Sequence, residues 1–279
     1  MKITDFDVYQ ALLKEKSGLV VTQDKSYLLE SRLNPVAKKW EYPSIEAMTI
    51  ALQGVPDKQM VVDIVEAMTT NETSFFRDLH PFETFENIAL PRLLEERVYN
   101  RKMRIWCAAA SSGQEPYSLA MLLKEQKAKF SGWNLEILAT DISHEILDQA
   151  RKGIYSQFEV QRGLPIKMLM DYFDQQDDNK WQLKQEIRDM IKYDYFNLLD
   201  SMSALGQFDM IFCRNVLIYF DEADKRQILD RMATQLTPDG FLFLGGAETV
   251  IGITDSFQPM PGIRGLYVKK DSPHLSVAA

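Results

Sequence analysis

The pattern of apolar and polar residues changes once along the chain, near residue 100. Before residue 70, apolar residues recur at spacings of three and four, as in Phe6, Tyr9 and Leu13, which is the pattern of a helix with one buried face. Start and stop signals predict four helices, at residues 4–18, 24–40 with a bend or break at Pro35, 44–54 and 56–68. We therefore expect residues 1–70 to form a small all-helical domain.

After residue 100, short apolar runs alternate with helical patterns. The expected strands are 103–107, 135–139, 193–198, 210–217, 241–244 and an edge strand at 265–270, and the expected helices are 116–126, 143–153 and 221–236. This alternation predicts a doubly wound α/β domain over residues 101–279, with a mainly parallel sheet. Residues 173–192 interrupt it with strand patterns at 181–183 and 187–191, which predicts an inserted β-hairpin subdomain. Residues 271–279 are expected to be an unstructured tail.

Composition and charge narrow the range of partners. The 279 residues include 32 Lys and Arg against 40 Asp and Glu, a net charge of −8, so binding to nucleic acid or to an anionic membrane surface is not expected. No apolar run approaches the roughly 18 residues of a membrane span, and the N-terminus does not resemble a signal peptide, so we expect a cytoplasmic protein. Cys107 and Cys213 lie in strand-like runs, which predicts two buried, reduced thiols and neither a disulfide nor a metal site.

The loop after the first expected strand is built of small residues. Residues 108–113 read Ala-Ala-Ala-Ser-Ser-Gly, and Gln114 and Glu115 follow at the start of the next helix. The carboxyl ends of parallel strands form the ligand crevice, and small side chains let a ligand approach the backbone, although tight strand-to-helix packing explains the same composition. The loop is not G-x-G-x-x-G, and Glu115 would repel a pyrophosphate. A cationic or zwitterionic ligand is therefore favoured over a dinucleotide.

Two further expected strands end in polar residues. Asp141 ends the second strand, where a carboxylate either accepts the hydroxyls of a ribose or caps the next helix. Glu115 and Asp141 together fit a nucleoside with a positively charged amino-acid tail, which is S-adenosylmethionine. The fourth apolar run contains Arg214, Asn215 and Tyr219, and a charged arginine is costly there unless it is paired or faces the crevice. The Asn-Pro-Pro-Tyr motif common in amine methylases of this fold is absent, so an oxygen acceptor is favoured.

Four blocks of sequence carry a resemblance to a known family. They are residues 71–77 (NETSFFR), 108–118 (AAASSGQEPYS), 139–142 (ATDI) and 208–221 (FDMIFCRNVLIYFD). In this order they resemble the chemotaxis-receptor glutamate O-methyltransferases, the CheR family, and the resemblance extends over nearly the whole chain. It implies the S-adenosylmethionine-dependent methyltransferase fold, with residues 1–70 docking the receptor and residues 71–100 linking the domains and contributing to the cofactor site.

The resemblance also implies an activity and the residues that perform it. A methyl group passes from S-adenosylmethionine to glutamate carboxylates of chemoreceptors, which leaves S-adenosylhomocysteine, in chemotaxis adaptation. Glu115 would face the ammonium group of the cofactor and Asp141 its ribose, with Gln114 standing where relatives often have glutamate. The whole implied cofactor site consists of Asn71, Thr73, Arg77, Glu115, Asp141, Asn197, Leu198, Arg214 and Asn215.

The expected reaction needs little proton chemistry. A glutamate carboxylate, with an ordinary pKa near 4.3, is already ionised at neutral pH and is itself the nucleophile, so positioning and desolvation are the expected contributions of the protein and no metal is required. Arg77 and Tyr219 are the candidates for orienting the substrate carboxylate, because a guanidinium suits two carboxylate oxygens and a phenol donates one hydrogen bond. Arg77 fits the carboxylate of the cofactor equally well, and the sequence does not separate the two roles.

The expected partner is the cytoplasmic helical domain of a chemoreceptor. Lys25, Arg32 and Lys39 are spaced by seven residues and Lys38 adjoins them, so a continuous helix would present them as one basic stripe. A solvated helix face explains the same stripe, but family members dock their receptors through this region. The insertion looks shorter than in relatives that bind the receptor's C-terminal pentapeptide tether, so tether binding is expected to be weak or absent.

Two alternative functions stay open at this stage. The first is a nicotinamide-dependent oxidoreductase on a similar sheet, against which the missing glycine-rich fingerprint counts. The second is a non-catalytic adaptor that binds the cofactor or the receptor without transferring methyl groups.

Overall fold

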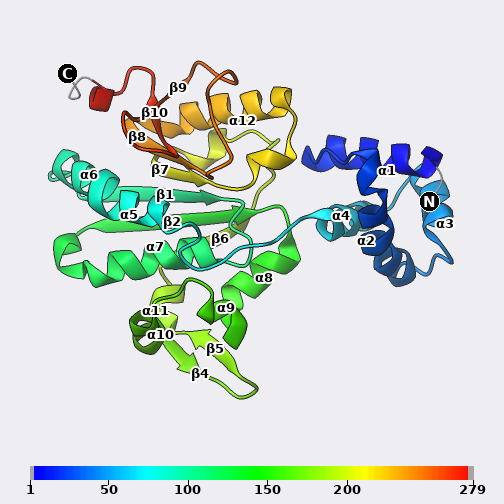
Figure 1. Cartoon of the computed structure of the whole chain (residues 1–279), viewed down its shortest axis with the longest axis horizontal. Helices are drawn as coiled ribbons and strands as arrows, with labels where there is room; N and C mark the ends of the chain where they lie inside the picture. Colours follow the sequence, from blue (N-terminus) through cyan, green and yellow to red (C-terminus); the bar gives the residue numbers. More distant parts are fainter. Residues whose placement is uncertain (1–2, 276–279) are drawn as a thin grey trace. The chain divides into compact units, whose positions relative to one another are not determined.

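The computed structural model describes residues 3–275, which divide into two compact units (Figure 1). The helical unit comprises the residues up to Thr70 together with Tyr219–Asp224. The larger unit comprises Asn71–Ile218 and the chain from Lys225 onward. Among the described residues, no helix is both long enough and apolar enough to cross a membrane.

The helical unit contains α1 (Ile3–Ser17), the 3-10 turn η1 (Gln23–Lys25), α2 (Ser26–Lys39), α3 (Ile45–Leu52) and α4 (Lys58–Met68). Ser44 caps α3 as expected, because its side chain accepts from the N–H of Ala47. Two expected boundaries are wrong. The helix α2 begins after η1 and is not broken at Pro35, and the cap of α4 is Asp57, whose carboxylate accepts from the N–H groups of Gln59 and Met60.

The segment Tyr219–Asp224 packs with α1 and the loop after it. Lys14 forms ion pairs with Asp221, at 2.6 Å, and with Asp224. The N–H of Val20 donates to the carbonyl of Tyr219 at 3.0 Å. These contacts explain why a segment distant in sequence belongs to the helical unit.

The larger unit is built on a seven-stranded sheet with the order β6-β2-β1-β7-β8-β10-β9. Its strands are β1 (Lys102–Ala108), β2 (Asn134–Asp141), β6 (Ile191–Tyr195), β7 (Phe208–Cys213), β8 (Leu236–Leu244), β9 (Phe257–Pro259) and β10 (Leu266–Lys269). The first five in the spatial order pair in parallel, whereas β10 is antiparallel to β8 and to β9. The expectation of a doubly wound, mainly parallel sheet is therefore confirmed.

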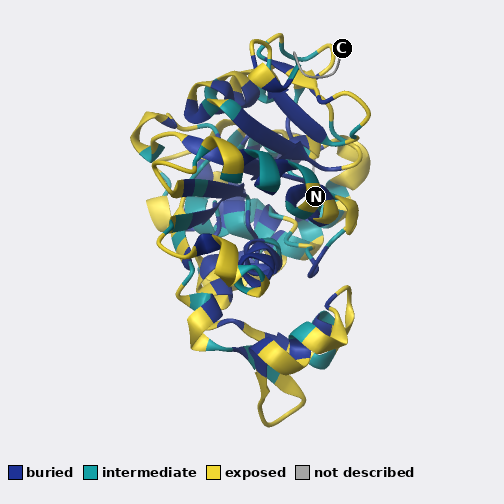
Figure 2. Ribbon diagram, turned by 90° about the vertical axis from the view of Figure 1, so that its left-hand side faces the viewer, coloured by how far each residue is buried: buried dark blue, intermediate teal, exposed yellow. Residues whose placement is uncertain are grey.

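Helices cover both faces of this sheet (Figure 1). On one face, alternate β1 side chains such as Ile105 and Cys107 join a core with α7 (Gln114–Glu125) and with three short helices, α5 (His80–Thr84), the π-helical η2 (Phe85–Ala89) and α6 (Leu90–Glu96). The buried side chains of α12 (Glu222–Gln235) are not part of that core. Trp106 is not part of it either, and its ring stacks on Phe208. The helix α8 (His144–Lys152) follows β2, and the central strand β7 is buried along its whole length (Figure 2).

Several expected elements of the larger unit need correction. The strand β7 ends at Cys213 rather than at residue 217. Residues 187–191 do not form a strand of the insertion, because α11 (Gln185–Arg188) occupies them and Ile191 begins β6. Within the expected tail, Pro273–Leu275 form the 3-10 turn η6, whose buried His274 stacks on Phe241, and residues 276–279 lie outside the described residues.

The insertion forms a separate antiparallel sheet with the order β3-β5-β4. The insertion does contain a hairpin, but β5 (Lys180–Leu183) pairs with β4 (Phe173–Gln175) and not with the expected strand at residues 187–191, and β3 (Ile154–Ser156) adds a third strand. The helices α9 (Gln157–Gln161) and α10 (Ile166–Tyr172) connect β3 to β4. Short 3-10 turns complete the larger unit at Lys127–Phe130 (η3), Ser203–Leu205 (η4) and, at its boundary, Leu217–Tyr219 (η5).

The small sheet packs against the segment that follows residue 70. Phe75 meets the rings of Tyr155 and Phe173 edge-on, at centroid distances of 5.0 and 5.6 Å. Gly163, with φ of +89°, lies so close that a Cβ atom there would be 2.1 Å from the carbonyl oxygen of Phe75. Only glycine fits this backbone contact.

We expect Gly163→Ala to destabilise the protein by about 2 to 5 kcal/mol, because left-handed strain and forced repacking add. Gly252 is the matched control, since it has φ of +76° and no atom lies within 4 Å of the point where its Cβ would stand. Urea unfolding should show a loss of only about 1 to 2 kcal/mol for Gly252→Ala. Equal losses in the two variants would contradict the close contact with Phe75.

Candidate functional site

The carboxyl ends of β1 and β2 meet around a loop of small residues. The loop follows Ala108, which pairs with Thr140, and it contains Ala109, Ser111 and Gly113 at φ of +58°, +51° and +92°. The carboxylate of Asp141 accepts from the N–H of Ser111 at 2.8 Å. Its other oxygen accepts from the N–H of Ser143 at 3.1 Å. The helix cap considered for Asp141 is wrong, because Ser143 caps α8 and accepts from the N–H of Ile146.

Two buried tyrosines, one on β3 and one on β6, lie against this loop. The hydroxyl of Tyr155, on β3, donates to the carbonyl of Ser112 at 2.7 Å. The hydroxyl oxygen of Tyr193, on β6, lies 2.5 Å from where a Cβ of Gly113 would stand, so a side chain at position 113 does not fit. Burial raises the pKa of Tyr155 and of Tyr193 well above the ordinary value, and both phenols therefore stay protonated.

The segment from Asn71 to Leu79 is attached to the same loop. The hydroxyl of Ser111 donates to the carbonyl of Asn71 at 3.0 Å, and the N–H of Phe76 donates to the hydroxyl of Ser118 at 3.0 Å. The side chain of Arg77 is half-buried and donates through Nη1 to the carbonyl of Glu72 at 2.7 Å. Thr73 is half-buried on this segment. The segment thus forms part of the loop's surroundings in the larger unit.

Arg214 is the most deeply buried charge at this edge, with only 2% of its side chain exposed. It follows the end of β7 and is therefore not inside the strand. Its Nη1 donates to Glu115 at 2.7 Å, and its Nη2 donates to the carbonyl of Arg77 at 2.9 Å and to Asp78 at 2.8 Å. Its guanidinium lies 5.6 Å from the ring centre of Phe82. The buried Nε has no hydrogen-bond partner within the described part of the chain.

Glu115 stands at the first turn of α7 with 12% of its side chain exposed. Burial raises the pKa of its carboxyl above the ordinary value, and the positive charge and hydrogen bond of Arg214 oppose this rise. A carboxylate in this environment gains stability from a further cation. The preceding Gln114 is buried and accepts a hydrogen bond from the hydroxyl of Ser112 at 2.8 Å.

Three more expected residues lie at the carboxyl edge of the larger unit. Asn197 and Leu198 follow β6, where the side chain of Asn197 accepts from the N–H of Leu199 at 3.0 Å and Leu198 is buried. Asn215 follows Arg214 with φ of +58°, and its N–H donates to Glu248 at 2.8 Å. Six of the expected residues therefore follow the carboxyl ends of parallel strands, namely Glu115, Asp141, Asn197, Leu198, Arg214 and Asn215. The other three, Asn71, Thr73 and Arg77, lie on the segment that is attached to the loop after β1.

The remaining expected residues belong to the helical unit. Tyr219 ends η5 and is half-buried. Arg32 donates to the carbonyls of Met68 and Thr69, at 2.9 and 2.8 Å, at the end of α4. Lys39 pairs with Asp63 at 2.7 Å. Two further cations, Lys25 and Lys38, are exposed.

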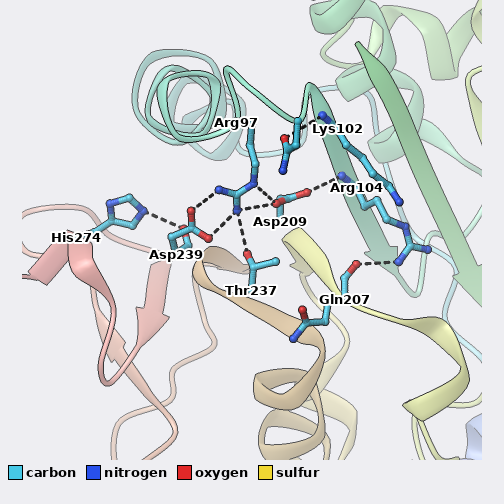
Figure 3. Close-up of polar contacts among 9 residues, drawn as sticks. Arg97, Lys102, Arg104, Gln207, Asp209, Thr237, Asp239 and His274 are labelled. Carbon is cyan, nitrogen blue, oxygen red and sulfur yellow. Dashed lines mark hydrogen bonds and ion pairs between the residues drawn. The ribbon is translucent and has the colours of Figure 1, made fainter.

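The opposite edge of the sheet carries a cavity of about 330 Å³ lined mainly by polar residues. Figure 3 shows the polar contacts at this edge. Arg97 there pairs with Asp209 at 2.8 Å and with Asp239 at 2.5 Å, and the N–H of Arg104 donates to Asp209 at 2.8 Å. Burial alone would raise the pKa of Asp239, but the hydrogen bond and charge of Arg97 outweigh burial and lower it. These charges satisfy one another, so we interpret this edge as structural.

Sequence reasoning missed two residues of the carboxyl edge. Asp78, which pairs with Arg214, is an exposed residue in a loop, and nothing in its neighbourhood marks it. Glu248 accepts from several backbone N–H groups. The signal for Glu248 was present, because the sequence Gly-Gly-Ala-Glu directly follows the fifth parallel strand, where a ligand crevice is expected.

The carboxyl edge suits a zwitterion attached to a nucleoside. The guanidinium of Arg214 is buried with one N–H unpaired among the described residues, and the carboxylate of Glu115 lies beside it. A second carboxylate, that of Asp141, is 26 positions after Glu115 in the sequence, and the loop at residues 108–113 has no large side chains. The sheet, counted in chain order, has strand order 3-2-1-4-5-7-6. Fold and site together define an S-adenosylmethionine-dependent methyltransferase.

Comparison with known proteins identifies the family. Residues 71–266 match the family model described as CheR methyltransferase, SAM binding domain. The chain is 38% identical over 265 residues to chemotaxis protein methyltransferase Cher2 of Pseudomonas putida, covering 93% of this chain and 96% of the relative. It is 40% identical over 267 residues to chemotaxis protein methyltransferase 1 of Pseudomonas aeruginosa, with the same coverage. The chain therefore belongs to the CheR methyltransferase family, and its cofactor is S-adenosylmethionine.

Among solved structures, the glycopeptide N-methyltransferase MtfA complexed with S-adenosylmethionine aligns with 63% of this chain and 51% of its own. The TM-score is 0.37 and the sequence identity is 16%.

Both cysteines lie beneath the site and are fully buried, as expected. Burial raises the pKa of Cys107 and of Cys213 well above the ordinary value, so neither thiol is a nucleophile. We expect iodoacetamide at pH 8 to leave both thiols unmodified in the native protein and to alkylate both after unfolding, as counted by mass spectrometry. Rapid alkylation of the native protein would contradict their burial.

Proposed function

We propose that this protein transfers a methyl group from S-adenosylmethionine to glutamate side-chain carboxylates of chemoreceptors and so forms glutamate methyl esters in chemotaxis adaptation. The observation that carries the proposal is the buried Arg214–Glu115 pair at the carboxyl edge of the sheet, in a chain of the CheR family. The names of the relatives, chemotaxis protein methyltransferases, support the receptor as substrate.

In this proposal the amino-acid part of the cofactor binds at Glu115 and Arg214. Glu115 faces the ammonium group, and Arg214, whose buried Nε has no hydrogen-bond partner among the described residues, borders the same part of the cofactor. Asp141 binds the ribose hydroxyls while its carboxylate continues to hold the loop. Asn197 and Leu198 border the adenine. The remaining contacts come from Asn71, Thr73, Arg77 and Asn215.

The chemistry follows from this arrangement. The bound cofactor supplies an electrophilic methyl group on a positively charged sulfur. The substrate carboxylate is ionised at neutral pH and needs no general base, so the side chains orient it and exclude water. Arg77 and Tyr219 are the proposed orienting residues, and only one Arg77 nitrogen, Nη1, is used by the described hydrogen bond to Glu72. Arg77 binds either the substrate carboxylate or that of the cofactor.

We further propose that residues 1–70 dock the cytoplasmic helical domain of the receptor. Residues 71–100 link this domain to a methyltransferase domain that spans residues 101–279. The protein is proposed to act in the cytoplasm. Lys25, Lys38 and Lys39 are all exposed, but Lys39 pairs with Asp63. Arg32 donates to carbonyls at the end of α4, so Lys25 and Lys38 are the best candidates for docking. Tether binding by the small sheet is proposed to be weak or absent.

Incubation with methyl-labelled S-adenosylmethionine and a cytoplasmic receptor fragment tests this function. We expect label on the receptor that mild alkali releases as methanol, because carboxyl esters hydrolyse readily in base. Base-stable label would contradict a carboxyl acceptor. Arg77→Ala is expected to lower transfer sharply, and unchanged transfer would remove Arg77 from both proposed roles. Unchanged affinity of this variant for S-adenosylhomocysteine would assign Arg77 to the substrate carboxylate, and weakened affinity would assign it to the carboxylate of the cofactor.

The raised pKa of Glu115 predicts a pH dependence of cofactor binding. Only the ionised carboxylate attracts the ammonium group, so affinity for S-adenosylhomocysteine should weaken as the pH falls through the raised pKa. Glu115→Gln should weaken binding by about tenfold or more at neutral pH, the worth of one charge-assisted hydrogen bond, and should flatten the pH dependence.

Calorimetry between pH 5.5 and 8 measures both effects. Glu125→Gln is the matched control, because Glu125 ends the same helix and bonds to Lys167 and Tyr172, away from the carboxyl edge. The control should bind as the unmodified protein does. A Glu115→Gln variant with unchanged affinity would exclude Glu115 from the cofactor site.

A further inference from the structure

The carboxylate of Glu248 accepts four backbone N–H groups. Its Oε2 accepts from Gly245 at 2.7 Å and from Asn215 at 2.8 Å. Its Oε1 accepts from Val216 at 2.9 Å and from Leu217 at 2.7 Å. Three consecutive N–H groups thus converge on one anion, as in the backbone nests that bind phosphate. Here a side chain of the same protein occupies the nest.

This contact joins two loops at the carboxyl edge of the sheet. Cys213, the last residue of β7, pairs in parallel with Leu244, the last residue of β8, so the loops that follow start side by side. Gly245 permits the contact, because a Cβ there would lie 2.7 Å from the carboxylate of Glu248 and 2.8 Å from the side-chain amide nitrogen of Asn215. The loop conformation therefore depends on glycine at 245 and on an anion at 248.

Arg214 is therefore held both through its side chain and through its backbone. Its guanidinium is bound to Glu115, to Asp78 and to the carbonyl of Arg77. Its backbone immediately precedes the three residues that Glu248 holds. Asn215 has a positive φ of +58°, which costs energy in a residue other than glycine, and its hydrogen bond to Glu248 compensates for that cost.

We propose that Glu248 is a positioning residue of the methyl-transfer site, which fixes the backbone at Asn215–Leu217 so that Arg214 and Asn215 are oriented before the cofactor binds. This inference rests on the proposed cofactor site. Glu248 does not touch the cofactor and acts through the loop. Charge-assisted bonds to four N–H groups are strong enough to hold a strained turn.

Glu248→Gln tests the proposal in the full chain. The variant keeps the size of the side chain, but it loses the charge and turns an N–H₂ group toward backbone N–H groups. We expect the dissociation constant for S-adenosylhomocysteine, measured by calorimetry, to rise by about tenfold or more. Glu248→Asp keeps the charge on a shorter side chain and should have an intermediate dissociation constant.

Asp209→Asn is the matched control for Glu248→Gln, because we expect Asp209 to stabilise the fold without positioning the cofactor site. Asp209 also accepts a backbone N–H and pairs with an arginine, but it lies at the opposite edge of the sheet (Figure 3). We expect this variant to lose stability and to bind S-adenosylhomocysteine as the unmodified protein does, at a temperature where it is folded. If Glu248→Gln behaves like the control, the positioning role is wrong.

Two further measurements complete the test. In the unmodified protein, hydrogen exchange at the N–H groups of Asn215, Val216 and Leu217 should be slow without any ligand, and fast exchange would contradict the proposal even if no variant at 248 folds. Failure of the unmodified protein to bind S-adenosylhomocysteine would overturn the proposed cofactor site itself. Unchanged affinity in a folded Glu248→Gln variant would overturn only the role of Glu248.

Discussion

The buried guanidinium of Arg214 is the constraint on which the site depends. A charge with 2% of its side chain exposed loses its hydration, and the cost is several kcal/mol unless hydrogen bonds replace the lost water. Glu115, Asp78 and the carbonyl of Arg77 supply those bonds. They come from α7 and from the segment after residue 70, so one arginine after β7 ties together three segments that are far apart in sequence.

The two edges of the central sheet deal with buried charge in different ways. At the amino edge, Arg97 is bonded through all its nitrogens to Asp209, Thr237 and Asp239, and the network is complete (Figure 3). At the carboxyl edge, the Nε of Arg214 is buried without a partner among the described residues. A complete network stabilises the fold, whereas an incomplete one has binding capacity left for a ligand. This difference favours the carboxyl edge as the proposed cofactor site.

The sequence predicted the elements whose periodicity is strong. The strands β1, β2 and β8 and the helices α7, α8 and α12 are found where they were expected, although β8 begins five residues earlier. The helices between residues 80 and 96 were missed, because they are short and are held by burial of Phe82, Phe85 and Leu90 rather than by local signals. Residues 187–191 were assigned to the wrong sheet, because an apolar run does not specify its partner strand.

The candidate site was predictable only in part, for a similar reason. Arg214 was singled out because a charge in an apolar run is costly, and this argument needs no knowledge of its partner. The partner Glu115 is 99 positions away, and no local pattern joins the two residues. For Arg32, the sequence pattern suggested a role that the tertiary contacts of its side chain do not support. Its spacing from Lys25 and Lys39 suggested a docking stripe, but its guanidinium bonds to carbonyls at the end of α4, a contact that only the tertiary structure creates.

Backbone strain is concentrated around the same edge. Six of the ten non-glycine residues with positive φ in the described chain lie in its three loops: Phe76, Asp78, Leu79, Ala109, Ser111 and Asn215. In each loop one strained residue donates its N–H to a side chain of another segment, namely Phe76 to Ser118, Ser111 to Asp141 and Asn215 to Glu248. Strained turns persist only where surrounding contacts hold them. Because these three contacts come from the protein itself, the loops have their shape before any ligand arrives, and binding does not have to supply the energy to form them.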